Sequence, residues 1–498
     1  MRNLVYSWVV ILAFLSCQTK SDFKIETVDF LKLEESYLEV VTVADSLDVP
    51  WGMAFFDGSL IFTEIKGRVK KLDLENGEVS TLLSLDSVFH QRTPGLLDIA
   101  VQKNEKKEPY VLLNYTTREG KEITSNLVRY TLHSDTLLDP LVLLKVKGST
   151  GHNGSRILID DRDVVYWATG DAQDNDQPQD STTLNGKILR LNLDGSIPKD
   201  NPIADSYVYA WGFRNMQGLT RDKSGNIFTS EHGDAIEDEV NLIKPLRNYG
   251  WPLVEGMVDT ESEISKTKEL EIEEPVRSWT PVIAPAGLSY YGSQAIPEWE
   301  NSLLLVTLKG QSLRVLTLGE NNTAITDEKV FFSKRYGRMR DVLTAPNGDV
   351  YISTSNQDWN PQPGFPLAGD DRILRIRKIN SSPQEYIEED VQSDTLALDG
   401  ALLYKNFCSS CHKDNGMGVP GNFPPLKNSK MVKEPSRFID ILLHGTDGKQ
   451  PIDGVMYNEP MASFSFLKDE ELSAIANYVN SKFGDGNHIS PEEIKKNR

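Results

Sequence analysis

Five consecutive residues near the end of the chain have the types and spacing needed to attach a redox group covalently. They read Cys408-Ser409-Ser410-Cys411-His412. In a C-x-x-C-H pattern each thiol can add to one vinyl group of a haem, and the adjacent histidine can bind the iron. We therefore predict a c-type haem that is bound covalently by Cys408 and Cys411, with His412 as an iron ligand. A haem held in this way carries single electrons.

Two other uses of a C-x-x-C pair fit this stretch less well. A zinc site needs two more cysteine or histidine ligands at short spacing, and the neighbouring sequence offers no such pair. A thioredoxin-like dithiol follows a strand and leads directly into a long helix. Here residues 413–418 are polar and contain glycine, which is typical of a loop.

The second iron ligand is expected to be a methionine, which raises the reduction potential of a haem. The methionines that follow the motif are Met417, Met431, Met456 and Met461. Met461 is favoured because its loop directly precedes the clearest helical pattern of the chain, at residues 469–482. Met417 is too close to the motif histidine to reach the opposite face of a haem easily. Met456 and His444 are the alternatives.

Charge and cysteine usage restrict the class of protein. The 498 residues carry a net charge of −20, which argues against nucleic-acid binding and against electrostatic attachment to anionic lipid. The third cysteine, Cys17, follows Arg2 and an apolar stretch too short for a comfortable membrane span. We expect a signal peptide over residues 1–17 with a lipoprotein-like cleavage site, and a periplasmic or cell-surface protein attached to the membrane only by lipid. The alternative is an ordinary signal peptide with an incidental cysteine.

The long middle of the chain has the pattern of a repeated β-structure. Short β-rich runs, such as residues 164–169, 226–229 and 349–354, alternate with polar turns, and one strand–turn–strand phrase recurs six times between residues 51 and 345. Repeated four-stranded units predict a six-bladed β-propeller. A large irregular β-sandwich is the alternative. The predicted fold is mainly β, followed by a small all-α domain.

Polar clusters interrupt these strands where a propeller places its loops over a central channel. They lie at residues 151–156, 211–218, 230–241, 248–252, 308–310 and 337–341. A histidine, several arginines and a lysine that meet in one channel predict an anionic ligand. Carboxylates between residues 231 and 239 predict a hard cation, and calcium fits best.

Residues 39–378 resemble the soluble pyrroloquinoline quinone (PQQ)-dependent glucose and aldose sugar dehydrogenases, a family of six-bladed propellers. The resemblance rests on Gly151-His152-Asn153-Gly154-Ser155-Arg156, on the Gly-Asp turn before Ala172, and on Arg214-Asn215-Met216-Gln217-Gly218. It implies that His152 is the general base and that Asp171 orients or assists it. The residues implied to bind PQQ are Arg214, Asn215, Gln217, His232, Lys309, Arg338 and Arg340.

The same resemblance implies two calcium ions. One would assist PQQ and be held by backbone oxygens of Gly233 and Asp234, and a structural one would involve Glu239 and the Tyr249 carbonyl. The chain departs from the family in two places, which concern sugar preference. The glutamine that precedes Gly-Leu-Leu is displaced in Gln91-Arg92-Thr93-Pro94, and His232 stands where other members carry glutamine.

Residues 396–484 resemble a class I cytochrome c. Gly400 and Tyr404 match its N-terminal helix, and Tyr478 lies in the C-terminal helix that crosses it. The predicted organisation is a signal peptide (1–17), a tether (18–38), the propeller (39–378), a polar linker (379–395), the cytochrome domain (396–484) and a tail (485–498).

The two resemblances together predict a quinohaemoprotein dehydrogenase. It would oxidise an aldose or a related alcohol or aldehyde with PQQ and calcium, and pass the electrons to its own haem c and then to an external acceptor. A calcium-dependent hydrolase of the lactonase type is one alternative, but it gives the haem no purpose and needs no basic cluster. A non-catalytic carbohydrate-binding propeller on a cytochrome is the other.

Overall fold

The computed structural model describes most of the chain. The described residues are 26–102, 109–234, 236–258, 261–390, 399–446, 450–452, 454–457, 461–465 and 467–498. The predicted signal peptide with Cys17 lies outside them, as do residues 18–25 of the predicted tether and residues 391–395 of the predicted linker. In this described part, no helix is long and apolar enough to cross a membrane.

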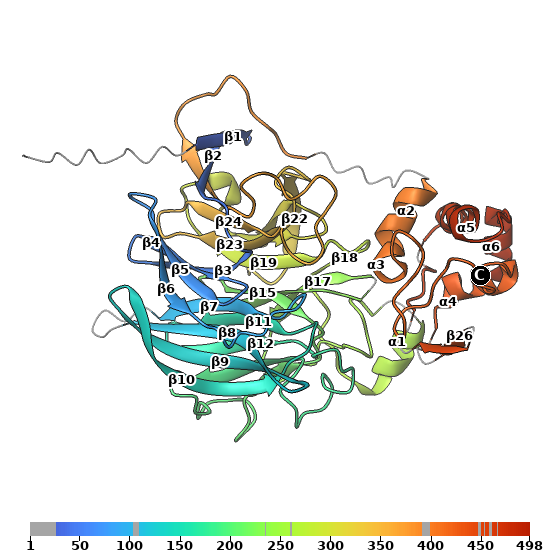
Figure 1. The fold of residues 1–498 in the computed structure, drawn as a ribbon, viewed down its shortest axis with the longest axis horizontal. Coiled ribbons are helices and arrows are strands. Elements are labelled where there is room, and N and C mark those ends of the chain that lie inside the picture. Colours follow the sequence, from blue (N-terminus) through green and yellow to red (C-terminus); the bar gives the residue numbers. More distant parts are fainter. Residues whose placement is uncertain are drawn as a thin grey trace, which may run out of the picture.

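Six antiparallel sheets of the described residues form a β-propeller, which confirms the predicted fold class (Figure 1). Blade 1 contains β3 (Pro50–Phe56), β4 (Ser59–Glu64), β5 (Arg68–Asp73) and β6 (Val79–Ser84). Blade 2 contains β7 (Leu96–Gln102), β8 (Tyr110–Glu119), β9 (Glu122–His133) and β10 (Thr136–Lys147). Blade 3 contains β11 (Gly154–Ile159), β12 (Val164–Thr169), β13 (Lys187–Asn192) and β14 (Val208–Trp211).

The remaining three blades complete the ring. Blade 4 contains β15 (Met216–Arg221), β16 (Ile227–Glu231), β17 (Asp238–Ile243) and β18 (Arg277–Trp279), with α1 (Glu261–Lys266) and a 3-10 turn, η1 (Thr267–Glu269), in the loop before β18. Blade 5 contains β19 (Pro285–Tyr291), β20 (Ser302–Thr307), β21 (Leu313–Leu318) and β22 (Ile325–Phe331), with η2 (Pro297–Trp299). Blade 6 contains β23 (Met339–Thr344), β24 (Val350–Thr354), β25 (Ile373–Ile379), β2 (Tyr37–Ala44) and β1 (Glu26–Lys32).

The second strand of most blades is buried along its whole length. This holds for β4, β12, β16, β20 and β24. Both faces of such a strand pack against neighbouring blades, so its sequence is a nearly continuous apolar run instead of an alternation. The run Val164–Thr169 is an example, and Trp167 within it is completely buried. Apolar clusters between adjacent blades hold the ring together.

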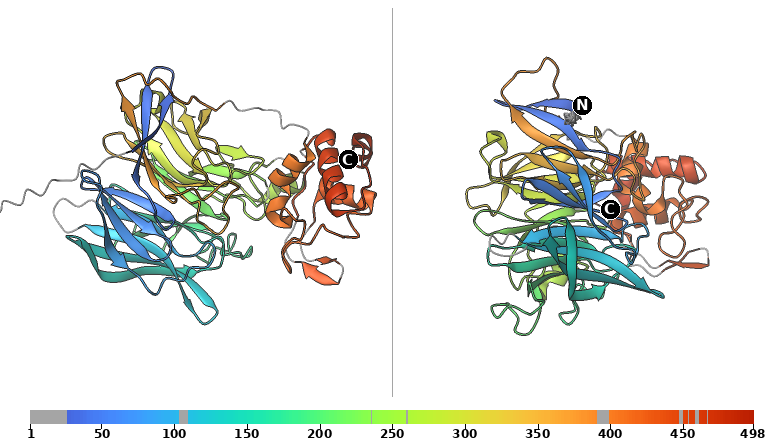
Figure 2. Two further views of the ribbon diagram at one scale, coloured as in Figure 1. Left: turned by 45° about the horizontal axis from the view of Figure 1, so that its top comes forward. Right: turned by 60° about the vertical axis from the view of Figure 1, so that its left-hand side comes forward.

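The chain after the propeller folds into a small helical domain at one end of the ring (Figure 2). It contains α2 (Gly400–Phe407), α3 (Ser409–His412), α4 (Pro435–His444), α5 (Asp469–Phe483) and α6 (Pro491–Asn497), with a short hairpin of β26 (Gln450–Ile452) and β27 (Val455–Tyr457). The predicted crossing of α2 and α5 is confirmed. A Cβ added to Gly400 would lie 2.2 Å from the Ala474 carbonyl, and the rings of Tyr404 and Tyr478 are 5.2 Å apart.

The structure differs from the predicted domain boundaries at two places. Strand β1 and the start of β2 lie within the predicted tether and belong to blade 6. Part of the predicted linker also returns to the propeller, where the Ile387 backbone pairs with Phe30 and Lys32 through hydrogen bonds of 2.8 Å. Both segments are polar and short. β1 pairs with the adjacent β2, but β2 joins the propeller through β25, and β1 contacts Ile387, both distant in sequence, so the local pattern resembles that of an unstructured connection.

Candidate active site

The predicted propeller residues gather at one end of the blades. Adjacent strands are antiparallel, so an inner strand begins at the same end at which the second strand finishes. The residues that precede or open an inner strand are His152, Arg214, Asn215, Gln217, Arg338 and Arg340. Those that follow a second strand are Asp171, His232 and Lys309. Blades 3, 4, 5 and 6 therefore all contribute to one site.

His152 and Asp171 form a buried pair. The Asp171 Oδ1 atom lies 2.9 Å from His152 Nδ1, and its Oδ2 atom accepts a hydrogen bond of 2.9 Å from the indole N–H of Trp251. Because a carboxylate only accepts, Nδ1 carries the proton and Nε2 is the basic nitrogen of the imidazole. The Asp171 side chain is fully buried, whereas that of His152 is 23 % exposed. This arrangement orients a general base that still reaches solvent or a ligand.

Close backbone packing fixes this pair. A Cβ on Gly170 would lie only 2.0 Å from the His152 carbonyl oxygen, so glycine is required before Asp171. The Asp171 N–H donates to the Arg214 carbonyl at 2.8 Å, which ties blade 3 to blade 4. The Asn215 side chain extends the link, because its Oδ1 accepts from the Gly154 N–H at 3.2 Å.

A chain of hydrogen bonds leads from these residues to the arginines of blade 6. The Gln217 side chain donates to Asn215 Oδ1 at 3.1 Å and accepts from Arg340 at 3.0 Å. Arg340 and Arg338 both donate to Asp358 Oδ2, at 3.0 and 3.3 Å. The structure thus unites seven of the predicted residues with Asp358, which the sequence did not single out.

The two arginines of blade 6, Arg338 and Arg340, are buried away from solvent. Burial lowers the pKa of Arg340 to about 10, against the attraction of Asp358, and burial also lowers the pKa of Arg338. One carboxylate faces two guanidinium groups, and Arg340 Nε is buried without a hydrogen-bond partner among the described residues. Such a site gains from an anionic ligand, because the ligand replaces the lost hydration of the arginines.

His232 and Arg214 add further unused donors and acceptors. Burial, followed by the nearby charges of Arg214 and Arg340, lowers the pKa of His232 to about 3, so this imidazole is neutral. Its Nε2 atom and the Nε atom of Arg214 are also buried without partners in the described part of the chain. Arg214 pairs with Asp234 at 2.6 Å and lies over the Trp251 ring. The residues present therefore fit a buried, polar, anionic group.

The predicted calcium ligands lie in a loop of blade 4 that is rich in buried carboxyls. Burial, with repulsion from Glu237 and Asp238, raises the pKa of Glu239 to about 7. Burial, with repulsion from Glu239, raises the pKa of Glu231 well above its ordinary value. Glu239 accepts from the Gly256 N–H at 2.8 Å, and the Tyr249 hydroxyl donates to the Leu242 carbonyl at 2.6 Å. No three His, Cys, Asp or Glu side chains of the described residues are grouped to hold a metal.

Gly233 and Asp234, the other predicted calcium ligands, open the same loop. The Gly233 N–H donates to Asp238 at 3.0 Å, and the Asp234 N–H donates to Glu255. Burial raises the pKa of Asp238 to about 7. The loop is thus held by carboxylates, while the backbone oxygens named by the prediction remain chemically suited to a hard cation.

The predicted iron ligands, His412 and Met461, both lie in the helical domain. His412 Nδ1 donates to the Pro424 carbonyl at 2.9 Å, which leaves Nε2 as the nitrogen that can bind iron. Met461 packs against the apolar core of the helical domain, whereas Met417 and Met456 are 53 % and 52 % exposed. This packing favours Met461 over those two candidates.

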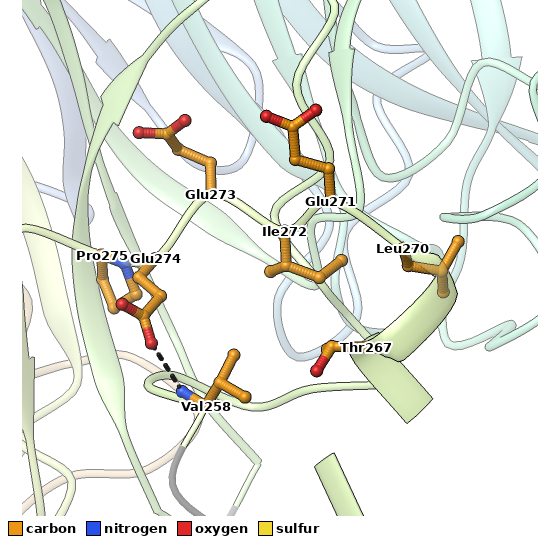
Figure 3. A pocket seen from close by; sticks show the side chains of 8 residues that line it. All are labelled: Val258, Thr267, Leu270, Glu271, Ile272, Glu273, Glu274 and Pro275. Carbon is orange, nitrogen blue, oxygen red and sulfur yellow. Dashed lines mark hydrogen bonds between the residues drawn. The ribbon is translucent and has the colours of Figure 1, made fainter. Parts of the chain in front are cut away.

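A shallow pocket lies elsewhere on blade 4 (Figure 3). It is lined by Val258, Thr267, Leu270, Glu271, Ile272, Glu273, Glu274 and Pro275. Its carboxylates already have partners: Glu274 accepts from the Val258 N–H, and Glu273 pairs with Lys244. None of the predicted site residues lines it.

Comparison with known proteins identifies a family for each of the two domains. A family model described as glucose/sorbosone dehydrogenase matches residues 47–360, and a cytochrome c model matches residues 397–482. The chain belongs to the glucose/sorbosone dehydrogenase family. This family member also carries a C-terminal cytochrome c domain.

Three relatives illustrate the two parts of the chain. Quinoprotein glucose dehydrogenase B of Acinetobacter calcoaceticus is 28 % identical over 69 % of this chain and 90 % of its own. The PQQ-bound aldose sugar dehydrogenase of Streptomyces coelicolor superposes with a TM-score of 0.60 and 29 % identity, over 72 % of this chain and 98 % of its own. Cytochrome c-552 of Thermus thermophilus is 40 % identical over 20 % of this chain and 84 % of its own.

Two residues of the site escaped the sequence analysis. Asp358 follows β24, and Trp251 follows Gly250 in a loop whose polar character was noted without a role for the indole. A polar residue just after a second strand was the available signal for Asp358, since Asp171 and His232 have the same placement. No local signal connects Trp251 with Asp171, because 80 residues separate them.

Proposed function

We propose that the protein is a PQQ-dependent sugar dehydrogenase that delivers electrons from the propeller to its own haem c. Membership of the family and the cytochrome c domain support an oxidoreductase of sugars with an electron-carrying domain. The use of PQQ is supported by the buried cluster of Arg214, Arg338 and Arg340 beside the His152–Asp171 pair. This cluster fits an anionic cofactor and the pair fits proton removal.

Each residue then has a definite task. His152 Nε2 accepts the proton of the sugar hydroxyl, and Asp171 stabilises the imidazolium that results. The blade 6 arginines neutralise the carboxylates of the cofactor, while the buried setting of the site excludes bulk water. PQQ, when bound, supplies the acceptor for the hydride from the sugar carbon.

Calcium, location and acceptor are further parts of this proposal. Backbone oxygens at Gly233 and Asp234 would hold a calcium that polarises the quinone, and Glu239 with the Tyr249 carbonyl would hold a structural one. The buried carboxyls of blade 4 support a cation there, because it would let them ionise. We also propose a lipid-anchored protein of the periplasm or cell surface that passes electrons to a cytochrome or membrane carrier.

A haem-reduction assay tests the proposal. The haem-loaded full chain is oxidised, supplied with calcium and PQQ, and mixed with a panel of aldoses while the haem absorption bands are followed. We expect sugar-dependent reduction that needs PQQ and is lost in His152→Ala. The matched control is His133→Ala, which removes a histidine on β9 outside the site. A protein that binds no PQQ, measured by equilibrium dialysis, would refute the proposal.

A further inference from the structure

One side chain connects the propeller site with the haem-carrying segment. Lys309 follows β20 at the site end of blade 5, and its Nζ atom donates to the backbone carbonyl of Asn406 at 2.8 Å. Asn406 lies in the last turn of α2, two residues before Cys408. In Figure 1, α2 and α3 are the helices of the small domain that face the propeller near β17 and β18. The contact therefore joins a predicted PQQ-binding residue to the haem motif.

A second contact joins the two domains independently of charge. Ile236 lies in the loop that carries Gly233 and Asp234, and it packs against the apolar core of the helical domain. That core includes Cys408 and Phe407. An apolar contact and a hydrogen bond from two different blades thus both join the propeller to the haem domain.

The chemistry of the Lys309 contact suits a lasting interaction. The carbonyls in the last turn of a helix lack partners within the helix and carry a partial negative charge, which a cation stabilises. The Lys309 side chain is partly buried at this contact, so water and salt screen the charge of its ammonium less than they screen that of a surface lysine. An ammonium has three N–H donors, and one bond to Asn406 leaves two for an anionic ligand.

We propose that Lys309 is the docking residue that holds the haem-carrying segment on the site end of the propeller, which makes the haem the built-in electron acceptor of that site. This inference rests on the proposed function. Oxidation of one sugar hydroxyl to a carbonyl releases two electrons and two protons. The haem iron takes one electron at a time, from Fe³⁺ to Fe²⁺, so a one-electron carrier in solution must reoxidise it between the two transfers. The docked geometry needs no swing of the haem domain between them.

The first experiment measures docking without any enzymatic turnover. Amide hydrogen exchange is followed by mass spectrometry in the haem-loaded full chain without PQQ, for the wild type, Lys309→Met and Lys405→Met. Lys405 is an exposed lysine of the same helix, so it serves as the control. We expect exchange over residues 403–412 to be roughly tenfold faster in Lys309→Met only, since a hydrogen bond from a charged donor is lost. Exchange in α5 should not change. Equal exchange in all three proteins would overturn the proposal.

The second experiment separates the docking from the proposed function. Ile236→Ala is loaded with haem, calcium and PQQ, and two rates are measured with a sugar: reduction of the haem and reduction of a small dye added in excess. We expect haem reduction to fall at least tenfold while dye reduction stays within twofold of the wild type. Unchanged haem reduction would overturn the docking proposal. Absence of dye reduction in the wild type would instead refute the proposed function and leave the exchange experiment as the test of docking.

Discussion

The substitution Asp358→Asn tests whether the blade 6 arginines are a preformed anion site. The Asp358 carboxylate is 3 % exposed and accepts hydrogen bonds from both Arg338 and Arg340. Its pKa is held below the ordinary value because the attraction of the two arginines outweighs burial, which acts in the opposite direction. Removing the charge leaves two buried guanidinium groups without compensation.

The expected cost follows from the burial of the pair. Removing one partner of a buried ion pair costs about 3–5 kcal/mol, and asparagine retains one acceptor, so we expect about 3 kcal/mol. A propeller of about 340 residues has an unfolding entropy near 0.7 kcal/mol per kelvin, which converts this loss to about 4 °C in Tm. Circular dichroism of the full chain without PQQ measures the shift.

A second test compares the Tm of Asp358→Asn with and without PQQ. PQQ at about 100 times its Kd adds about 2.7 kcal/mol of stability, which should raise the Tm of Asp358→Asn by about 4 °C. The matched control is Asp135→Asn, which removes an exposed pair with Lys71 and should change Tm by less than 1 °C. A Tm of Asp358→Asn within 1 °C of the wild type would refute the reasoning.

Three further predictions concern the base, the pH dependence of stability and the haem. Trp251→Phe removes the N–H donor of a fully buried Asp171 oxygen, so we expect kcat for sugar oxidation to fall about tenfold, with PQQ binding unchanged in a fluorescence titration. Burial raises the pKa of Asp371 to about 6 from 3.8, so the folded state binds more protons than the unfolded state between these values, and stability falls as the pH rises from about 4 to 6. In denaturant titrations at several pH values, the free energy of unfolding should fall less over this range in Asp371→Asn than in the wild type, and the difference should be at most about 3 kcal/mol. An identical dependence on pH in the two proteins would count against this role. Met461→Ala should lower the haem reduction potential in a spectroelectrochemical titration without releasing the haem, whereas the exposed Met456→Ala should not, and the reverse result would reassign the ligand.

The parts of the site that were predictable are those with local signals. The haem motif is contiguous, and His152 and Asp171 lie in short glycine-containing turns next to buried strands, where contiguous motifs carry the resemblance to the sugar dehydrogenases. The bond from Lys309 to Asn406 spans 97 residues and two domains, and nothing in either neighbourhood predicts it. Docking depends on how two finished folds fit together, and that information is spread over both surfaces.

The same reasoning applies to the fold. Regular strand–turn–strand phrases gave the number of blades, because each phrase is one local hairpin. The assignment of β1 to the tether failed because β1 is an edge strand with a polar sequence. Its neighbour β2 joins the propeller through β25, and β1 itself contacts the backbone of Ile387, both of which are distant in sequence.

The pairing of β2 with β25 has a consequence for the order of folding. Tyr37 lies opposite Ile379 in this ladder, so the first and last strands of the propeller meet in one sheet. Closing so long a loop is costly in chain entropy and makes folding slow, because the ladder forms only after its whole sequence is available. During synthesis the propeller therefore stays an open ring until residue 379 has been added. The haem domain comes later in the chain, so the propeller can close before the haem-carrying segment has been synthesised.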